Sequence, residues 1–222
     1  MPASADAHAA RLDNSRLAST LEACLKPLEA TAPRTMVDLG WGPAVDTVLG
    51  RNWRDNLRPA AVLVAVRRVW PEPRIVLTVR TRQLRAHAGQ ISLPGGRADP
   101  GDEFPVGTAL READEETHIR PNQIEPLGLL DDYPTISKYR VTPVVGWLDA
   151  DARTRAHPQE VDEIFEVPLR DVLDPRRYQR TMVARFGGLK VFELQHGPHR
   201  IWGATAGMLW NLQERFHAAL ER

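Results

Sequence analysis

The chain's strongest clue to its architecture is the stretch GGRADPGDEFPVGTALREADEET, residues 95–117. Its second half predicts a helix on which Glu112, Glu115 and Glu116 stand at i, i+3 and i+4 and therefore share one face. Like charges at this spacing cost roughly 0.2–0.5 kcal/mol per pair, and the local countercharge is Arg111, four residues before Glu115. A bound cation is therefore the expected source of compensation.

The composition is that of a globular protein. The chain has 222 residues, of which 42% are hydrophobic and 26% charged, and this favours one enlarged domain. Lys plus Arg equals Asp plus Glu at 29 each, so no overall basic field attracts nucleic acid or an acidic membrane surface. The single cysteine, Cys24, fits a reducing compartment and excludes a cysteine-rich zinc module. The start of the chain lacks an apolar secretory core, so a cytoplasmic location is expected.

The N-terminal part predicts one amphipathic helix. Leu17, Leu21, Leu25 and Leu28 repeat at helical spacing, which indicates a helix over residues 15–30. We assign this helix to an N-terminal extension, residues 1–35, followed by the main domain over residues 36–222. Residues 31–58 show no clear period and are expected to pack on the main domain.

Strands outnumber helices in the rest of the chain. Apolar, β-branched runs separated by turn signals predict strands over residues 58–70, 74–81, 125–132 and 139–148. The run EIFEVPLRDVL predicts a strand that passes into a short helix, and MVARFGG with KVFELQH predicts a hairpin around Gly187 and Gly188. A C-terminal helix is indicated by the apolar stripe of Met208, Leu209, Leu212, Phe216 and Leu220. This pattern predicts an α+β fold built as an α/β/α sandwich.

The acidic helix and its leading loop resemble the box of the Nudix hydrolase family. The matching residues are Gly96, Glu103, Arg111, Glu112, Ala113, Glu115, Glu116 and Ile119. Six residues separate Gly96 from Glu103 where the family has five, so either the loop is one residue longer or Asp102 takes the place of the first acid. His118 stands where the family has its last glycine, a residue that normally permits a left-handed helix end.

The segment LTVRTRQLRAHAGQISLPGG, residues 77–96, resembles a second signature, carried by the Nudix enzymes that cleave coenzyme A. The matching residues are Leu77, Thr78, Arg80, Arg85, Gly89, Pro94, Gly95 and Gly96. The resemblance extends over roughly residues 58–215. It implies a Nudix-type sandwich with a mixed central sheet, a Mg²⁺ or Mn²⁺ cofactor, and hydrolysis of coenzyme A or its thioesters to 3',5'-ADP and a 4'-phosphopantetheine product.

Residue types and the resemblance together predict the metal site. Magnesium takes oxygen ligands, and Glu112, Glu116 and Glu115 supply them on a rigid helix. Glu115 and Arg111 are also predicted to be catalytic, with Arg111 pairing with Glu115 to hold it in position. An acid from a loop after the box, Glu160 or Glu163, is the candidate for a further ligand or general base.

The predicted substrate site precedes the helix. Arg80 and Arg85 are expected to bind phosphate oxygens, because guanidinium groups suit them, and Gly89, Gly95 and Gly96 let the backbone approach closely. Two alternatives stay open: a Nudix pyrophosphatase acting on ADP-ribose or another nucleoside diphosphate derivative, and a Nudix-fold binding module without catalysis. The expected partner is a small molecule, with neither nucleic acid nor membrane, and a homodimer is a candidate assembly.

Overall fold

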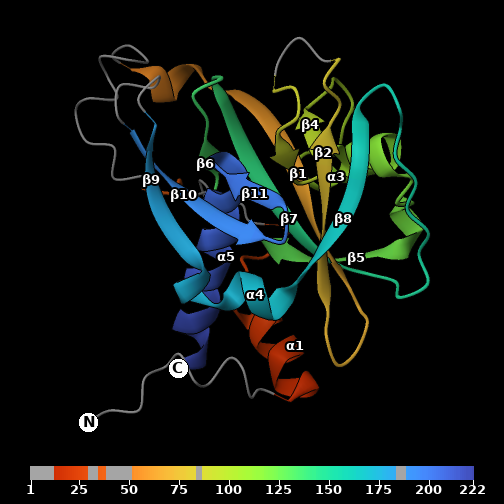
Figure 1. The fold of residues 1–222 in the computed structure, drawn as a ribbon, viewed down its shortest axis with the longest axis vertical. Helices are drawn as coiled ribbons and strands as arrows, with labels where there is room; N and C mark the ends of the chain where they lie inside the picture. The colour runs from red at the N-terminus through yellow and green to blue at the C-terminus, as the bar shows by residue number, and fades with distance from the viewer. Residues whose placement is uncertain (1–12, 30–34, 39–51, 84–86, 184–188) are drawn as a thin grey trace.

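A mixed sheet with helices on both faces forms the centre of the protein (Figure 1). The computed structural model describes residues 13–29, 35–38, 52–83, 87–183 and 189–222. Within them, the main sheet has eight strands with the central order β3-β2-β1-β7-β5, while β4 pairs with β1, β6 with β7 and β8 with β2. The strands are β1 (Arg58–Arg67), β2 (Arg74–Arg80), β3 (Ile91–Ser92), β4 (Gly95–Arg97), β5 (Ile124–Leu129), β6 (Tyr133–Pro134), β7 (Tyr139–Leu148) and β8 (Val161–Pro168).

The pairing of β1 fixes the position of the glycine-rich loop. β1 runs parallel to β7 over its whole length, from Arg58 opposite Tyr139 to Arg67 opposite Leu148. On its other edge, β1 pairs antiparallel with β4, and Ala61 lies opposite Gly96. The paired glycines are therefore held at the edge of a rigid central strand.

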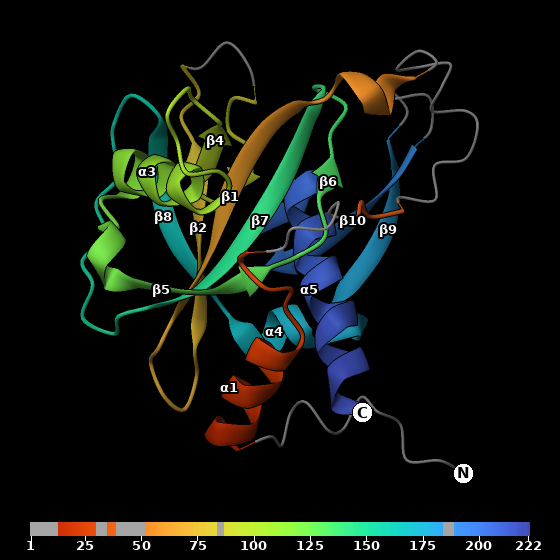
Figure 2. The same ribbon diagram turned by 180° about the vertical axis from the view of Figure 1, so that it is seen from behind.

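Both faces of β1 are buried because its apolar residues pack alternately on two different layers. Ala61, Leu63 and Ala65 belong to the core cluster that includes Ala109 and Ala113 of α3 (Val106–Thr117). The even-numbered residues of β1 pack instead in the core cluster that includes α5 (Ala204–Leu220). Figures 1 and 2 show α3 and α5 on opposite sides of β1 and β7.

A second, three-stranded antiparallel sheet lies beside α5. It contains β9 (Tyr178–Val183), β10 (Leu189–His196) and β11 (His199–Trp202), in the order β11-β10-β9. The second strand of the predicted hairpin is confirmed as β10, which pairs with β9 from Tyr178 opposite Leu194 to Val183 opposite Leu189. The predicted first strand, MVARFGG, coincides with β9 at Met182 and Val183. The expected turn at Gly187 and Gly188 lies outside the described residues. The short helix α4 (Leu169–Leu173) follows β8, as EIFEVPLRDVL predicts.

The N-terminal helix is shorter than its leucine pattern predicts. α1 spans Asn14–Ala23 and is capped by the Asp13 side chain, which accepts a hydrogen bond from the Arg16 N–H. The prediction of a helix to residue 30 is wrong, because Lys26 leaves the helix to form a β-bridge with Leu129. Leu17 and Leu21 of α1 are buried in the same cluster as α5. The domain boundary at residue 35 stays a prediction.

The predicted fold class is confirmed as an α+β sandwich built on a mixed sheet. Three 3-10 turns complete the described elements: η3 (Trp53–Asn56), η4 (Pro121–Gln123) and η5 (Pro175–Arg177). None of the described helices combines the length and the apolar character that crossing a membrane would require.

Candidate active site

Arg111, on α3, is the cation that joins this helix to the loop that leads into it. Its Nε and Nη2 atoms donate to the two carboxylate oxygens of Asp102 at 3.1 and 3.0 Å. Asp102 also accepts hydrogen bonds from the Thr108 hydroxyl at 2.8 Å and from the Asp99 N–H at 3.0 Å. The hydrogen bonds from Arg111 hold the pKa of Asp102 well below its usual value. Glu103 is exposed, so the acid that contacts Arg111 is Asp102, one residue earlier.

Glu112 lies against the second glycine of the loop. Its Oε1 is 2.9 Å from Arg111 Nη1, and burial raises the pKa of its carboxyl group. A Cβ atom on Gly96 would lie 2.5 Å from the Glu112 carboxylate carbon. Only glycine leaves room there, and the loop backbone therefore approaches the carboxylate directly.

Glu116 is the most deeply buried acid of the helix, with 1% of its surface exposed. Its Oε1 is 3.0 Å from Arg80 Nη1, and its Oε2 accepts a hydrogen bond from the Gly95 N–H at 3.1 Å. Burial raises the pKa of Glu116 to about 7, although Arg80 and the Gly95 N–H both act to lower it. The second strand, the loop and the helix therefore meet at this one carboxylate.

Glu115 differs from its two neighbours in exposure. Its side chain is 56% exposed, and its Oε2 lies 3.2 Å from Arg111 Nη1, which is the pair that the sequence predicts. Glu112 and Glu116 face the glycine loop, whereas Glu115 lies at the solvent edge of that face. At the end of α3, His118 itself adopts the left-handed conformation, with φ of 57°, and its N–H donates to the Asp114 carbonyl. The helix thus ends as the family's glycine would end it.

The two candidate acids beyond the box occupy different environments. Glu160 precedes β8, where its carbonyl accepts a hydrogen bond from the Thr81 N–H at 2.9 Å. Its charge contributes to the raised pKa values of both Glu112 and Glu116. Glu160 also lines a small open cavity with Asp114, Glu115, His118 and His157.

Glu163 lies on β8 and contacts a different part of the molecule. Its Oε1 is 3.1 Å from His199 Nε2, and the His199 ring stacks on Phe165. Glu163 is opposite Val79 in the pairing of β8 with β2. The structure therefore brings Glu160, and not Glu163, near the acids of α3.

The structure describes one of the two arginines that are predicted to bind phosphate. Arg80 pairs with Glu116, and Gly89, with φ of +69°, donates its N–H to the Arg80 carbonyl at 3.0 Å. Arg85 lies outside the described residues. Arg97 is exposed and pairs with Asp99 at 2.9 Å.

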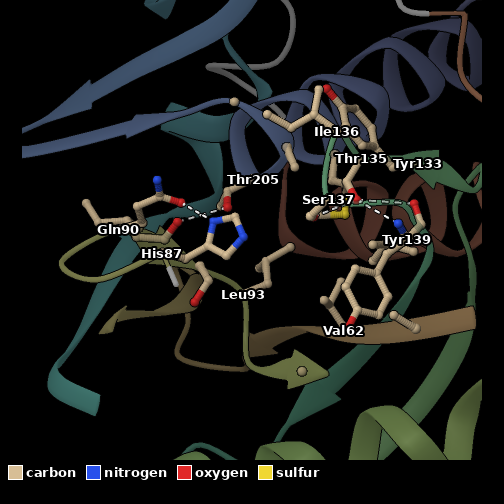
Figure 3. Close-up of a pocket in the computed structure, with 18 of the residues that line it drawn as sticks. Val62, His87, Gln90, Leu93, Tyr133, Thr135, Ile136, Ser137, Tyr139 and Thr205 are labelled. Atoms are coloured by element: carbon tan, nitrogen blue, oxygen red, sulfur yellow. Dashed lines mark hydrogen bonds between the residues drawn. The ribbon is translucent and has the colours of Figure 1, made fainter. Parts of the chain in front are cut away.

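A cavity of about 830 Å³ opens on the side of β1 that faces away from α3 (Figure 3). Its rim includes Arg80, Gly95 and Gly96, and its far wall includes Gly203 and Met208 at the start of α5. The sequence offers no clue to this cavity, because its walls come from loops and short strands far apart in the chain. The segment Tyr133–Tyr139 between β5 and β7 and the first turn of α5 form much of it.

The carboxylates of α3 suit a hard divalent cation. Among the residues that the structure describes, no group of three or more His, Cys, Asp or Glu side chains is gathered tightly enough to hold a metal as it stands. Glu116 is nevertheless buried and Glu112 half-buried, and this burial raises the pKa of both carboxyl groups. Carboxylate oxygens are the ligands that Mg²⁺ and Mn²⁺ prefer, and the Glu112 carboxylate lies directly against the loop backbone at Gly96.

Comparison with known proteins places the chain in a family. A NUDIX domain profile matches residues 57–186. The "Uncharacterized Nudix hydrolase NudL" of Photorhabdus laumondii is 41% identical over 162 residues, which cover 72% of this chain and 86% of that protein. Its namesake from Escherichia coli K12 is 40% identical over 158 residues, covering 71% and 82%. The chain therefore belongs to the Nudix hydrolases, enzymes that act on pyrophosphate bonds of nucleotide derivatives.

Solved Nudix structures are also similar to the chain. The MutT protein of Methanosarcina mazei Go1 has a TM-score of 0.49 and 17% identity, covering 75% of this chain and 96% of that one. An Ap4A hydrolase of C. elegans, solved as a binary complex, has a TM-score of 0.44 and 22% identity, covering 51% and 83%.

Proposed function

We propose that this Nudix hydrolase cleaves the pyrophosphate bond of coenzyme A and its derivatives. Water adds across the P–O–P linkage, so one phosphate leaves as part of 3',5'-ADP and the other as part of 4'-phosphopantetheine or its acyl form. The observation that carries the proposal is the meeting of both signatures at Glu116, which binds Arg80 of the upstream segment and the Gly95 N–H of the loop. Gly89, a further residue of the upstream signature, supports the Arg80 backbone.

Glu112 and Glu116 are the proposed metal ligands, with Glu115 as a third. When bound, Mg²⁺ or Mn²⁺ would neutralise charge on the phosphoryl oxygens and lower the pKa of the attacking water. Arg111 positions this set, because it contacts Glu112 and Glu115 while Asp102 holds its other face. Arg80 keeps Glu116 oriented toward the loop. The Gly95–Gly96 backbone, which has no side chains, lies directly beside the two carboxylates.

Glu160 is the proposed general base. It lines an open cavity together with Glu115, and its charge helps to raise the pKa values of Glu112 and Glu116. A base in this position can accept the proton of a water molecule that approaches from the solvent side. Glu163 is the weaker candidate, because its carboxylate bonds with His199 at the start of β11. Arg85 remains a proposed phosphate ligand together with Arg80.

The proposal is tested by assaying the purified protein, with and without Mg²⁺ or Mn²⁺, against coenzyme A, 3'-dephospho-coenzyme A, ADP-ribose and a dinucleoside polyphosphate. Product masses identify the bond that breaks. We expect coenzyme A to be cleaved at least about tenfold more efficiently than the dephospho form, since a charge-assisted hydrogen bond contributes roughly 1.5–3 kcal/mol. A preference for ADP-ribose would refute the coenzyme A assignment and leave the hydrolase chemistry intact, whereas no metal-dependent turnover would favour a binding module. The mass of the same preparation in solution tests the proposed homodimer.

A further inference from the structure

The connection between β7 and β8, residues 149–160, runs past the C-terminal end of α3 (Figures 1 and 2). The last carbonyl groups of a helix have no partner within the helix. Here the His157 N–H donates to the Glu116 carbonyl at 2.9 Å. The Arg155 N–H donates to the Thr117 carbonyl at 2.9 Å as well. The connection is therefore bonded to the end of the helix that carries the acids of the site.

The same connection ends at Glu160. The His157 carbonyl accepts hydrogen bonds from the Glu160 N–H at 3.0 Å and from the Val161 N–H at 2.8 Å, so residues 157–160 form one tight turn. His157 is thus bonded to α3 through its N–H and to Glu160 through its carbonyl. On the other side of the turn, the Thr81 N–H donates to the Glu160 carbonyl. A short path of hydrogen bonds therefore sets where Glu160 lies relative to α3.

His118 adds side-chain contacts to this backbone path. Its Nδ1 lies 3.2 Å from the Arg155 carbonyl oxygen, and its Nε2 lies 2.6 Å from an Arg155 guanidinium nitrogen. In the tautomer with its proton on Nδ1, the ring donates to the carbonyl and accepts from the guanidinium, so one ring satisfies both contacts. A glycine would end the helix in the same left-handed conformation. It would make neither contact.

The start of the connection is anchored on a different element. Arg67 of β1 is buried, and its Nη1 donates to the Asp149 and Ala152 carbonyls at 3.3 and 2.6 Å. The connection is therefore tied to β1 at its start and to α3 further along. His118 holds the part that lies between Ala152 and the turn before Glu160.

We propose that His118 is a positioning residue: by holding Arg155, it fixes the connection on the end of α3 and so places the Glu160 carboxylate for the reaction. The inference rests on the proposed function, in which Glu160 is the general base. His118 and Glu160 line the same small open cavity, so a shift of the connection changes the space in which the base acts. A base must lie within hydrogen-bond reach of the water that it activates, and a small displacement of a reacting group lowers the rate strongly.

The test is a double-mutant cycle of His118→Gly and Glu160→Gln. It measures kcat and KM at one metal concentration, on the substrate of the panel that the wild type cleaves best. His118→Gly removes the ring at a backbone conformation that glycine adopts freely. We expect this variant to lower kcat at least about fivefold and to leave KM within about twofold. In the Glu160→Gln background the same substitution should change kcat less than about twofold, because residues that act through one group are not additive.

Two further variants control for effects on folding and on the surface. His118→Asn should lower kcat as His118→Gly does, because asparagine tolerates the left-handed conformation and its short amide does not replace both ring contacts. Arg120→Ala is the matched control, since Arg120 is 59% exposed and pairs with Asp114 at the same end of α3. Its kcat should stay within about twofold of the wild-type value. Thermal melting shows whether each variant is folded.

The outcomes separate the inference from the proposed function. Wild-type kcat in both folded His118 variants would overturn the inference and leave the proposed function standing. An equal fold-loss of kcat with and without the Glu160 carboxylate would show that His118 acts on the fold or on α3 itself, and would also overturn it. Wild-type kcat in Glu160→Gln would refute the proposed general base, and the inference with it. A preference for ADP-ribose would refute the coenzyme A assignment alone, because the cycle is then measured on ADP-ribose.

Discussion

The Cα atom of Gly96 faces the carboxylate of Glu112 so closely that a Cβ would lie 2.5 Å from its Oε2. A methyl group there must displace a half-buried acid that Arg111 also holds. We therefore expect Gly96→Ala to lower kcat/KM at least about tenfold, or about 1.4 kcal/mol in barrier. Gly197→Ala is the control, because its Cβ would meet nothing within 4 Å. Near-normal activity in Gly96→Ala would show that Glu112 can move without consequence.

Glu116→Gln should remove most turnover while the protein stays folded, because a neutral amide is a poorer ligand for a hard dication. Thermal melting with and without Mg²⁺ gives a second readout, since a metal that binds only the folded state raises its Tm. The wild type should show this increase, and so should the control Glu22→Gln on α1. A loss of less than about tenfold, with the Mg²⁺ response retained, would remove Glu116 from the metal site. The same criterion applies to Glu112→Gln.

Glu160→Gln and Glu163→Gln should behave differently. General bases contribute roughly 10²–10⁴-fold, so Glu160→Gln should lower kcat by about that amount with little change in KM. Glu163→Gln weakens the contact with His199, but the Glu163 side chain is 52% exposed. Exposed pairs contribute little, so kcat should stay within about threefold of the wild-type value. Steady-state kinetics on both variants decides. A strong loss in Glu163→Gln alone would reverse the assignment.

Asp102→Asn should weaken the enzyme, whereas Glu103→Gln should not. Asp102 binds Arg111 through both carboxylate oxygens, and a bidentate pair fixes the guanidinium plane that positions Glu112 and Glu115. We expect a fall in kcat/KM of at least about tenfold in Asp102→Asn. A loss in Glu103→Gln with normal activity in Asp102→Asn would mean that Glu103 is the acid that holds Arg111 in solution.

Asp131→Asn tests the attachment of the N-terminal segment to α5. Asp131 bonds with Lys26 at 2.5 Å, Asn211 at 3.0 Å and Arg215 at 3.4 Å. Burial would raise the pKa of Asp131, but the hydrogen bonds from its partners lower it from 3.8 to about 2. Because the pKa of Asp131 is lower in the folded state than in the unfolded state, its ionised form stabilises the folded protein at pH values above the pKa of the unfolded state. This contribution, about 2 kcal/mol at most, is present above about pH 4 and is lost as the pH falls toward 2.

Chemical denaturation at pH 7 and at pH 3 measures this effect. The wild type should lose more stability between the two pH values than Asp131→Asn does, because the amide does not titrate. Asp151→Asn, at an exposed position, serves as control. An identical pH dependence in the wild type and Asp131→Asn would contradict the prediction.

The sequence predicts the central strands and α3 well because their patterns follow from local rules. β1 and β7 are long apolar runs, and their burial on both faces matches that composition. α1 is overestimated because the leucine spacing continues to Leu28, whereas a tertiary bridge between Lys26 and Leu129 ends the helix earlier. β3, β4 and β6 are two or three residues long, too short to leave a periodic signal.

In the candidate site, too, local patterns predict some features, whereas others depend on tertiary contacts. The helical spacing groups Glu112, Glu115 and Glu116, but it cannot reveal that Glu116 is buried and Glu115 exposed, which depends on the loop packed above them. The sequence leaves open whether Asp102 or Glu103 is the first acid of the box, and the contact between Asp102 and Arg111 decides it. The pairing of Arg80 with Glu116 joins residues on different elements, so no local pattern predicts it. The cavity depends on side chains from the whole length of the domain and is invisible in the sequence.

The parallel ladder between β1 and β7 has a consequence for how the chain folds. Arg58 pairs with Tyr139, so the ladder closes a loop of roughly 80 residues, and such non-local pairing is slow to form. The glycine loop and α3 lie inside that loop and pack on β1. β1, the strand on which the glycine loop and α3 pack, therefore gains its parallel neighbour only after β7 has been synthesised, and a ribosome-bound chain that stops before residue 139 lacks that flank of the site's support.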